Sequence, residues 1–163
     1  MENTKPVKEL ELYLIRHGQS MGNAGYDKDE LTIKEENDPI LTEKGLLQAD
    51  LLGKYLSDVD FDVVYSSGLI RAICTADGLL RHQNSRKNLN ILPLLSEVGI
   101  SPEYDGLTLD EIKTYCKTAV LADGVSENAP RVCYYSFEKE NEIFDSAGNV
   151  IRYFRDKYKN GEK

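Results

Sequence analysis

Residues 12–20 read Leu-Tyr-Leu-Ile-Arg-His-Gly-Gln-Ser, an apolar run that ends in an arginine, a histidine and a glycine. From Glu9 the chain first alternates and then becomes continuously apolar up to Arg16, which predicts a strand that enters the core. Ligands of open α/β sheets bind beyond the carboxyl ends of the strands, so we expect Arg16 and His17 at a ligand site. Gly18 has no side chain and allows the backbone to turn closely around that ligand.

The composition limits the class of protein. The chain has 163 residues with 20 Lys+Arg and 28 Asp+Glu, a formal net charge of −8, and this length predicts a single domain over residues 1–163. The acidic balance argues against a nucleic-acid partner, because phosphate backbones are bound by clustered cations, but it allows a small anionic substrate. No apolar run approaches the roughly 18 residues of a membrane span. The first nine residues lack the apolar stretch of a secretory signal, so we expect a cytoplasmic protein with no membrane partner.

The metal-binding residue types are few. The three cysteines form no CxxC pair, and the chain has only two histidines, so we expect free thiols and no structural zinc site.

Hydrophobic spacing and capping residues predict alternating helices and strands along the rest of the chain. This order indicates a parallel sheet with helices on its faces. The predicted strands after the first are 61–66 and 89–95, and the predicted helices are 42–57, 67–80 (capped by Ser67), 108–117 and 147–158. The first helix is predicted from apolar residues that recur at helical spacing, namely Leu46, Ala49, Leu52, Tyr55 and Leu56. Residues 27–38 hold two lysines and six carboxylates and are expected to form a solvated loop, and 120–145 are expected to be irregular.

Two further charged residues follow predicted strands, Arg71 after the second and Glu97 after the third. Together with Arg16 and His17 they bring two cations, an imidazole and a carboxyl group to three successive strand ends. This set suits the cleavage of a phosphate ester. The arginines compensate the charge of the phosphate oxygens, a neutral His17 attacks phosphorus, and a protonated Glu97 supplies the proton to the leaving oxygen. The scheme needs no metal or other cofactor.

Four blocks of sequence, in this order, resemble the signature of the histidine phosphatase superfamily, also called the phosphoglycerate-mutase-like family. The blocks are Arg16-His17-Gly18-Gln19-Ser20 with Asn23, residues 41–49, residues 65–72 with Thr75-Ala76, and Glu97 with Asp105-Gly106-Leu107-Thr108. The resemblance implies a three-layer α/β/α fold with a mainly parallel sheet, phosphoglycerate-mutase-like.

The same resemblance implies the roles of single residues. His17 is the phosphorylated nucleophile, Arg16 and Arg71 clamp the phosphate, and Glu97 is the proton donor. Asn23 lines the substrate pocket, and Gln19 and Ser20 of the same motif are expected to bind substrate. Because the run from Glu97 to Gly106 is about one residue longer than the commoner pattern, Glu103 and Asp105 remain alternative acids.

One family feature is missing from the sequence. Members have a second histidine after a later strand, which pairs beside the first strand, whereas this chain has only His17 and His82, and His82 lies near the end of a predicted helix. Nothing after Tyr158 resembles a strand. We therefore expect a domain truncated at its C-terminus, with an apolar strand edge left under-covered. A natural short form stabilised by self-association, as a homo-oligomer, is the alternative.

These features predict a metal-independent phosphomonoester hydrolase or a phosphoglycerate-mutase-like phosphotransferase that acts through a phosphohistidine at His17. A phosphatase is favoured, because the mutases have extra segments that enclose the substrate. The alternative is a catalytically silent or truncated member that binds phosphate or a phosphorylated partner. A Rossmann-type nucleotide binder is excluded because no GxGxxG follows the first strand.

Overall fold

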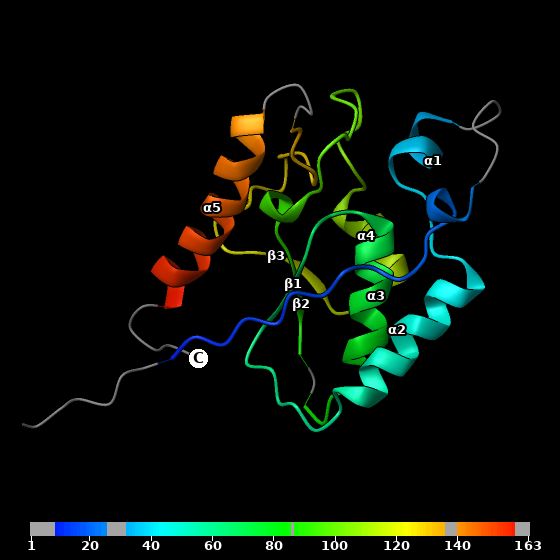
Figure 1. Ribbon diagram of the computed structural model, residues 1–163, viewed down its shortest axis with the longest axis vertical. Helices are drawn as coiled ribbons and strands as arrows, with labels where there is room; N and C mark the ends of the chain where they lie inside the picture. Colours follow the sequence, from blue (N-terminus) through cyan, green and yellow to red (C-terminus); the bar gives the residue numbers. More distant parts are fainter. Residues whose placement is uncertain (1–8, 26–31, 86, 136–139, 159–163) are drawn as a thin grey trace, which may run out of the picture.

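The computed structural model describes residues 9–25, 32–85, 87–135 and 140–158. In this part of the chain the sheet has three parallel strands, β1 (Val64–Ser66), β2 (Leu89–Ile91) and β3 (Ala119–Leu121), in the order β1-β2-β3. Val64 lies opposite Leu89, and Leu89 lies opposite Ala119. Figure 1 shows α5 on one side of the sheet and α2, α3 and α4 on the other.

Among the described residues, the helices lie close to where the sequence predicts them, with two differences, and one strand was not predicted. The five are α1 (Ile33–Asn37), α2 (Glu43–Tyr55), α3 (Ile70–Leu80), α4 (Leu109–Tyr115) and α5 (Glu140–Tyr158), with short 3₁₀ turns at Gly22–Ala24 and Pro93–Leu95. α1 lies in the predicted loop 27–38, and α5 begins at Glu140, seven residues before the predicted start at 147. β3 was missed, because its partner β2 lies about 30 residues away in the sequence, beyond the reach of local spacing.

Two hydrophobic layers cover the two faces of the sheet. On the α3 and α4 face, Ile70, Ile73, Ile91 and Ile112 are each exposed by 1% or less. On the other face, Phe154 of α5 packs on β1 and the turns that follow β2 and β3. The centroid of its ring lies 5.1 Å from that of Tyr65 in β1. The α/β fold class and its three-layer arrangement are thereby confirmed.

Helix α2 buries small residues, two of which, Ala49 and Gly53, face α3. Gly45, Ala49 and Gly53, four residues apart on one helical face, are the buried residues of α2. A Cβ at Gly53 would lie 2.5 Å from the carbonyl oxygen of Gly78 in α3, so the two backbones touch. Two of the apolar residues whose spacing predicts this helix lie outside its buried face: Leu46 and Tyr55 are 48% and 84% exposed.

The helix caps divide into local and distant ones. The Thr42 hydroxyl accepts a hydrogen bond from the amide of Gly45, and Thr108 forms the predicted capping box with Glu111. Ser67 does not cap α3, contrary to expectation. The first amide of that helix, Ile70 N, instead donates to Oδ1 of Asp38 at 2.7 Å, a partner 32 residues away.

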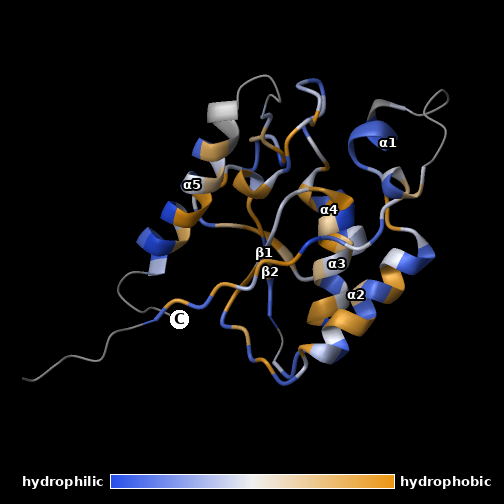
Figure 2. Cartoon of the chain, in the orientation of Figure 1, coloured by the Kyte–Doolittle hydropathy of each residue, from blue (hydrophilic) through white to orange (hydrophobic). Residues whose placement is uncertain are grey.

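Residues 9–19 form no strand, so the predicted first strand is wrong. Leu10, Leu12, Tyr13, Leu14 and Ile15 are 40–80% exposed rather than in the core. A groove of about 1080 Å³, lined mainly by apolar surface, lies between this segment and β1. The groove separates the segment from the open edge of β1, so residues 9–19 form no strand hydrogen bonds with it. Figure 2 shows its apolar residues along the trace in front of β1.

In the described residues, no helix combines the length and the apolar character that crossing a membrane requires.

Candidate active site

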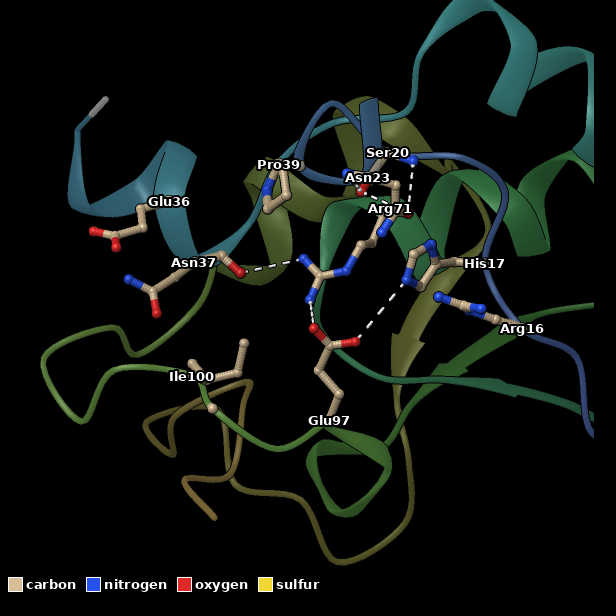
Figure 3. Close-up of a pocket in the computed structure, with 12 residues that line it drawn as sticks. Arg16, His17, Ser20, Asn23, Glu36, Asn37, Pro39, Arg71, Glu97 and Ile100 are labelled. Atoms are coloured by element: carbon tan, nitrogen blue, oxygen red, sulfur yellow. Dashed lines mark hydrogen bonds and ion pairs between the residues drawn. The ribbon is translucent and has the colours of Figure 1, made fainter. Parts of the chain in front are cut away.

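The hydrogen bonds of His17 define which ring nitrogen is available for chemistry. Its Nδ1 lies 2.7 Å from the carbonyl oxygen of Gly18. A carbonyl oxygen only accepts, so Nδ1 donates and the lone pair of the neutral ring is on Nε2. Nε2 lies 3.9 Å from Oε2 of Glu97, and the His17 side chain is 14% exposed. Nε2 is thus directed at Glu97, the predicted acid (Figure 3).

Contacts with two helices, and not with a sheet, hold this segment. The amide of Gly18 donates to Oγ1 of Thr75 at 3.0 Å, and that hydroxyl donates to the carbonyl oxygen of Arg71 at 2.7 Å. A Cβ at Gly18 would lie 2.5 Å from the carbonyl oxygen of Gly45. The glycine is therefore required by the close approach of α2, a reason that the sequence did not indicate.

Arg71, in the first turn of α3, is almost entirely buried, with 3% of its side chain exposed. Its Nη1 donates to the carbonyl oxygen of Asn37 at 3.2 Å. Its Nη2 donates to Oε1 of Glu97 at 2.5 Å. Half of the Glu97 side chain is exposed, so this carboxylate joins a fixed guanidinium to an accessible pocket.

The pocket has a volume of about 270 Å³. Six of the seven predicted site residues line it: Arg16, His17, Ser20, Asn23, Arg71 and Glu97. Ser20 and Asn23 hold each other, since the Ser20 hydroxyl donates to Oδ1 of Asn23 at 3.0 Å. Gln19 is the exception, because its Oε1 accepts a hydrogen bond from the hydroxyl of Thr42 at 3.0 Å, which ties it to the start of α2.

The remaining candidates lie elsewhere. Glu103 and Asp105 are exposed and do not belong to the described residues that line the pocket. Nε2 of His82 lies 2.7 Å from Oδ1 of Asp50, at the far end of α3, and His82 is also outside the lining. This arrangement favours Glu97 as the acid and gives His82 a structural contact between α2 and α3.

Sequence reasoning missed one wall of the pocket. Its missed lining residues are Gly22, Glu36, Asn37, Pro39, Gly99 and Ile100. The expectation of a solvated loop over 27–38 is wrong at its end, where Asn37 and Asp38 are 9% and 2% exposed. The uncharged residues 39–41 that follow were the only local signal, because the partners that bury Asn37 and Asp38 lie more than 30 residues away.

Comparison with known proteins assigns the class. The family described as the histidine phosphatase superfamily (branch 1) matches residues 12–162, and the chain belongs to it. Among its relatives, the fructose-2,6-bisphosphatase TIGAR of Xenopus laevis is 36% identical over 110 residues, 66% of this chain and 38% of that protein. The 2,3-bisphosphoglycerate-dependent phosphoglycerate mutase of Bartonella henselae is 38% identical over 109 residues, 64% of this chain and 50% of that protein. The relatives thus include both phosphatases and mutases.

A solved structure supports the fold. The ecdysone phosphate phosphatase of Bombix mori, in complex with tungstate, superposes with a TM-score of 0.55 at 19% identity, over 98% of this chain and 60% of that one. The chain spans half or less of the length of the two curated relatives described above.

Proposed function

We propose that this chain provides the phosphate-cleaving site of a metal-independent phosphomonoesterase that acts through a phosphohistidine on His17. The main support is the hydrogen bond from Nδ1 of His17 to Gly18, which leaves Nε2 unprotonated and directed toward Glu97. The same bond stabilises the positive charge that the ring gains when Nε2 forms a bond to phosphorus.

In the proposed first step, the lone pair of Nε2 forms a bond to phosphorus while the bond from phosphorus to the ester oxygen breaks. Glu97 gives its proton to that oxygen, so the product leaves as a neutral alcohol. In the second step, a water oxygen bonds to phosphorus, its proton passes to Glu97, and the phosphorus–nitrogen bond breaks. Inorganic phosphate is released and both side chains return to their starting states.

The charges of the pocket suit this sequence of events. The two arginines supply permanent positive charge to the phosphate oxygens without a metal ion. When a phosphate replaces Glu97 on Nη2 of Arg71, a dianion comes to lie beside the carboxyl group. A neighbouring negative charge favours the protonated form of Glu97, which is the form that the first step requires.

A phosphatase is favoured over a mutase. Hydrolysis of the phosphohistidine needs water at the pocket, and Glu97 is half exposed. A mutase must instead exclude water while the substrate reorients, which needs segments that enclose the pocket.

The test is hydrolysis of p-nitrophenyl phosphate in excess EDTA by the wild-type chain, His17→Ala and His82→Ala. The two variants remove the two histidines in turn, one at the site and one at the far end of α3. We expect His17→Ala to lose activity by about 10³-fold or more, whereas His82→Ala keeps most of it. Activity that survives in His17→Ala would falsify the assignment of the nucleophile.

A second experiment traps the intermediate. A ³²P-labelled substrate, quenched in alkali, should leave label on the wild-type chain that is stable to base and released by acid, as expected for phosphorus bonded to a histidine nitrogen. The label should be absent from His17→Ala. Label that remains after acid treatment would indicate an ester and contradict the proposed chemistry.

The second candidate is a binding protein for phosphate or a phosphorylated partner that does not turn over. One observation favours it: within the described residues the pocket contains a single imidazole. In this case the wild-type chain releases no p-nitrophenol, while inorganic phosphate binds to it and not to Arg71→Ala.

A further inference from the structure

Asp38 is the most completely buried carboxylate among the described residues, with no exposure of its side chain. Its Oδ1 accepts a hydrogen bond from the amide of Ile70 at 2.7 Å. Its Oδ2 accepts one from the hydroxyl of Tyr104 at 2.8 Å. Oδ1 also lies 3.6 Å from Nη1 of Arg71. The carboxylate therefore contacts the first amide of α3, the Arg71 side chain in the same helix, and the loop that follows Glu97.

Asn37 extends this arrangement on both sides. Its carbonyl oxygen accepts the hydrogen bond from Nη1 of Arg71, and its Oδ1 accepts one from the amide of Ser101 at 2.6 Å. Nη1 is thus held from the interior by two adjacent residues, Asn37 and Asp38. The other end of the guanidinium, Nη2, is left for Glu97 and the pocket (Figure 3).

Burying a carboxylate is costly unless it is paired, and burial raises the pKa of Asp38 above its usual value. The Tyr104 hydroxyl, the Ile70 amide and the Arg71 charge oppose that rise. Burial also raises the pKa of Tyr104, so its hydroxyl remains a donor to the carboxylate. A helix cap alone does not need a buried charge, since a serine or asparagine oxygen accepts an amide equally well.

We propose that Asp38 is a positioning residue for phosphate binding that acts through Arg71. It fixes the inner end of the guanidinium, so that Nη2 is already aimed into the pocket before a phosphate arrives. Preorganised charge binds an anion more tightly than a side chain that must first be ordered. The inference rests on the proposed role of Arg71 in binding phosphate, and it assigns a function to a residue that does not line the pocket.

The test measures binding of inorganic phosphate by calorimetry, which does not depend on turnover. Asp38→Asn keeps the shape and the acceptor for Ile70 but removes the charge beside Arg71. We expect it to weaken phosphate binding about tenfold. Tyr104→Phe removes one hydrogen bond and leaves both charges, so it should weaken binding less than threefold.

A double-mutant cycle separates positioning from a structural role. In an Arg71→Lys background the side chain has a single ammonium that cannot bond at both ends, so Asp38→Asn should change phosphate affinity less than twofold. Thr108→Ala, which removes the cap of α4 without contacting Arg71, is the stability control and should leave affinity unchanged while lowering the urea midpoint.

Three results would overturn the proposal. In the first, Asp38→Asn weakens phosphate binding by the same factor in the wild-type and Arg71→Lys backgrounds. In the second, Asp38→Asn in the wild-type background does not weaken phosphate binding. In the third, Asp38→Asn weakens phosphate binding no more than Thr108→Ala does. If the wild-type chain binds no phosphate, the proposed function fails together with this inference. If the wild-type chain binds phosphate and Asp38→Asn binds it equally well, only the inference fails.

Discussion

The two sides of β1 are built differently. On the β2 side, the parallel register continues to β3, and the isoleucines between sheet and helices are fully buried. On the other side lies the groove, and beyond it residues 9–16, which pair with no strand and expose apolar side chains. Yet Gly18, which follows His17 at the end of this unpaired segment, donates a hydrogen bond to Thr75 of α3 and lies against Gly45 of α2. The comparison shows that the site is anchored to the helices and not to the sheet edge.

The largest expected effect on stability comes from comparing one isoleucine on each side of β1. Ile73, in α3, is 0% exposed, and Ile15, in the unpaired segment, is 42% exposed. Ile73→Ala removes buried methyl groups and leaves a cavity, so we expect a loss of about 2–5 kcal/mol in the free energy of unfolding. Ile15→Ala should cost less than about 1 kcal/mol, because its side chain has little buried surface to lose.

Urea denaturation followed by circular dichroism measures both variants. If Ile15→Ala proves as costly as Ile73→Ala, residues 9–16 are packed in solution and the contrast between the two sides is wrong.

The second prediction contrasts two helix glycines. Gly53→Ala places a methyl group 2.5 Å from the carbonyl oxygen of Gly78 and 2.6 Å from the ring of His82, so α2 must move from α3. We expect a loss of roughly 1–3 kcal/mol in the free energy of unfolding, despite the better helix propensity of alanine. The comparison is Gly148→Ala in α5. The methyl group it adds would have Nη1 of Arg152 as its nearest atom, at 3.3 Å, and that flexible side chain can move away.

Gly148→Ala should therefore stabilise the chain by about 0.5–1 kcal/mol. Urea midpoints that shift in opposite directions from the wild-type value in the two variants would support close backbone packing of α2 on α3. A stabilising Gly53→Ala would contradict it.

These contrasts also explain which features the sequence could predict. The blocks around His17, Arg71 and Glu97, and the caps at Thr42 and Thr108, depend on residues close together in the chain, and the structure bears out the caps and gathers the site residues. The burial of Asp38, the strand β3 and the small-residue face of α2 depend on partners about 30 residues away. The strand predicted over residues 9–16 is wrong because strand pairing depends on how close the segment comes to β1, a distant part of the chain, and local spacing cannot report that distance.

The smallest effect compares two surface ion pairs. On the α2–α3 side, Asp50 contacts Lys54 at 2.8 Å and His82 at 2.7 Å, and these partners lower its pKa from 3.8 to about 2. On the α5 side, a single hydrogen bond from Lys157 lowers the pKa of Asp123, which is 91% exposed. Because both pKa values are lower in the folded chain, each carboxylate stabilises the fold above the pKa of the unfolded chain and loses this contribution as the pH falls.

Asp50→Asn should therefore lower the urea midpoint slightly at about pH 5, and the difference from wild type should shrink as the pH falls from about 4 toward 2. Asp123→Asn should change the urea midpoint in the same direction but by a smaller amount, since Asp123 has one partner and is more exposed than Asp50. Equal amplitudes would mean that the second partner of Asp50 adds nothing to stability at this pH. A larger amplitude for Asp50 would show that a carboxylate with two partners, one of them His82 beyond the end of α3, stabilises the fold more than a carboxylate bound by a single lysine.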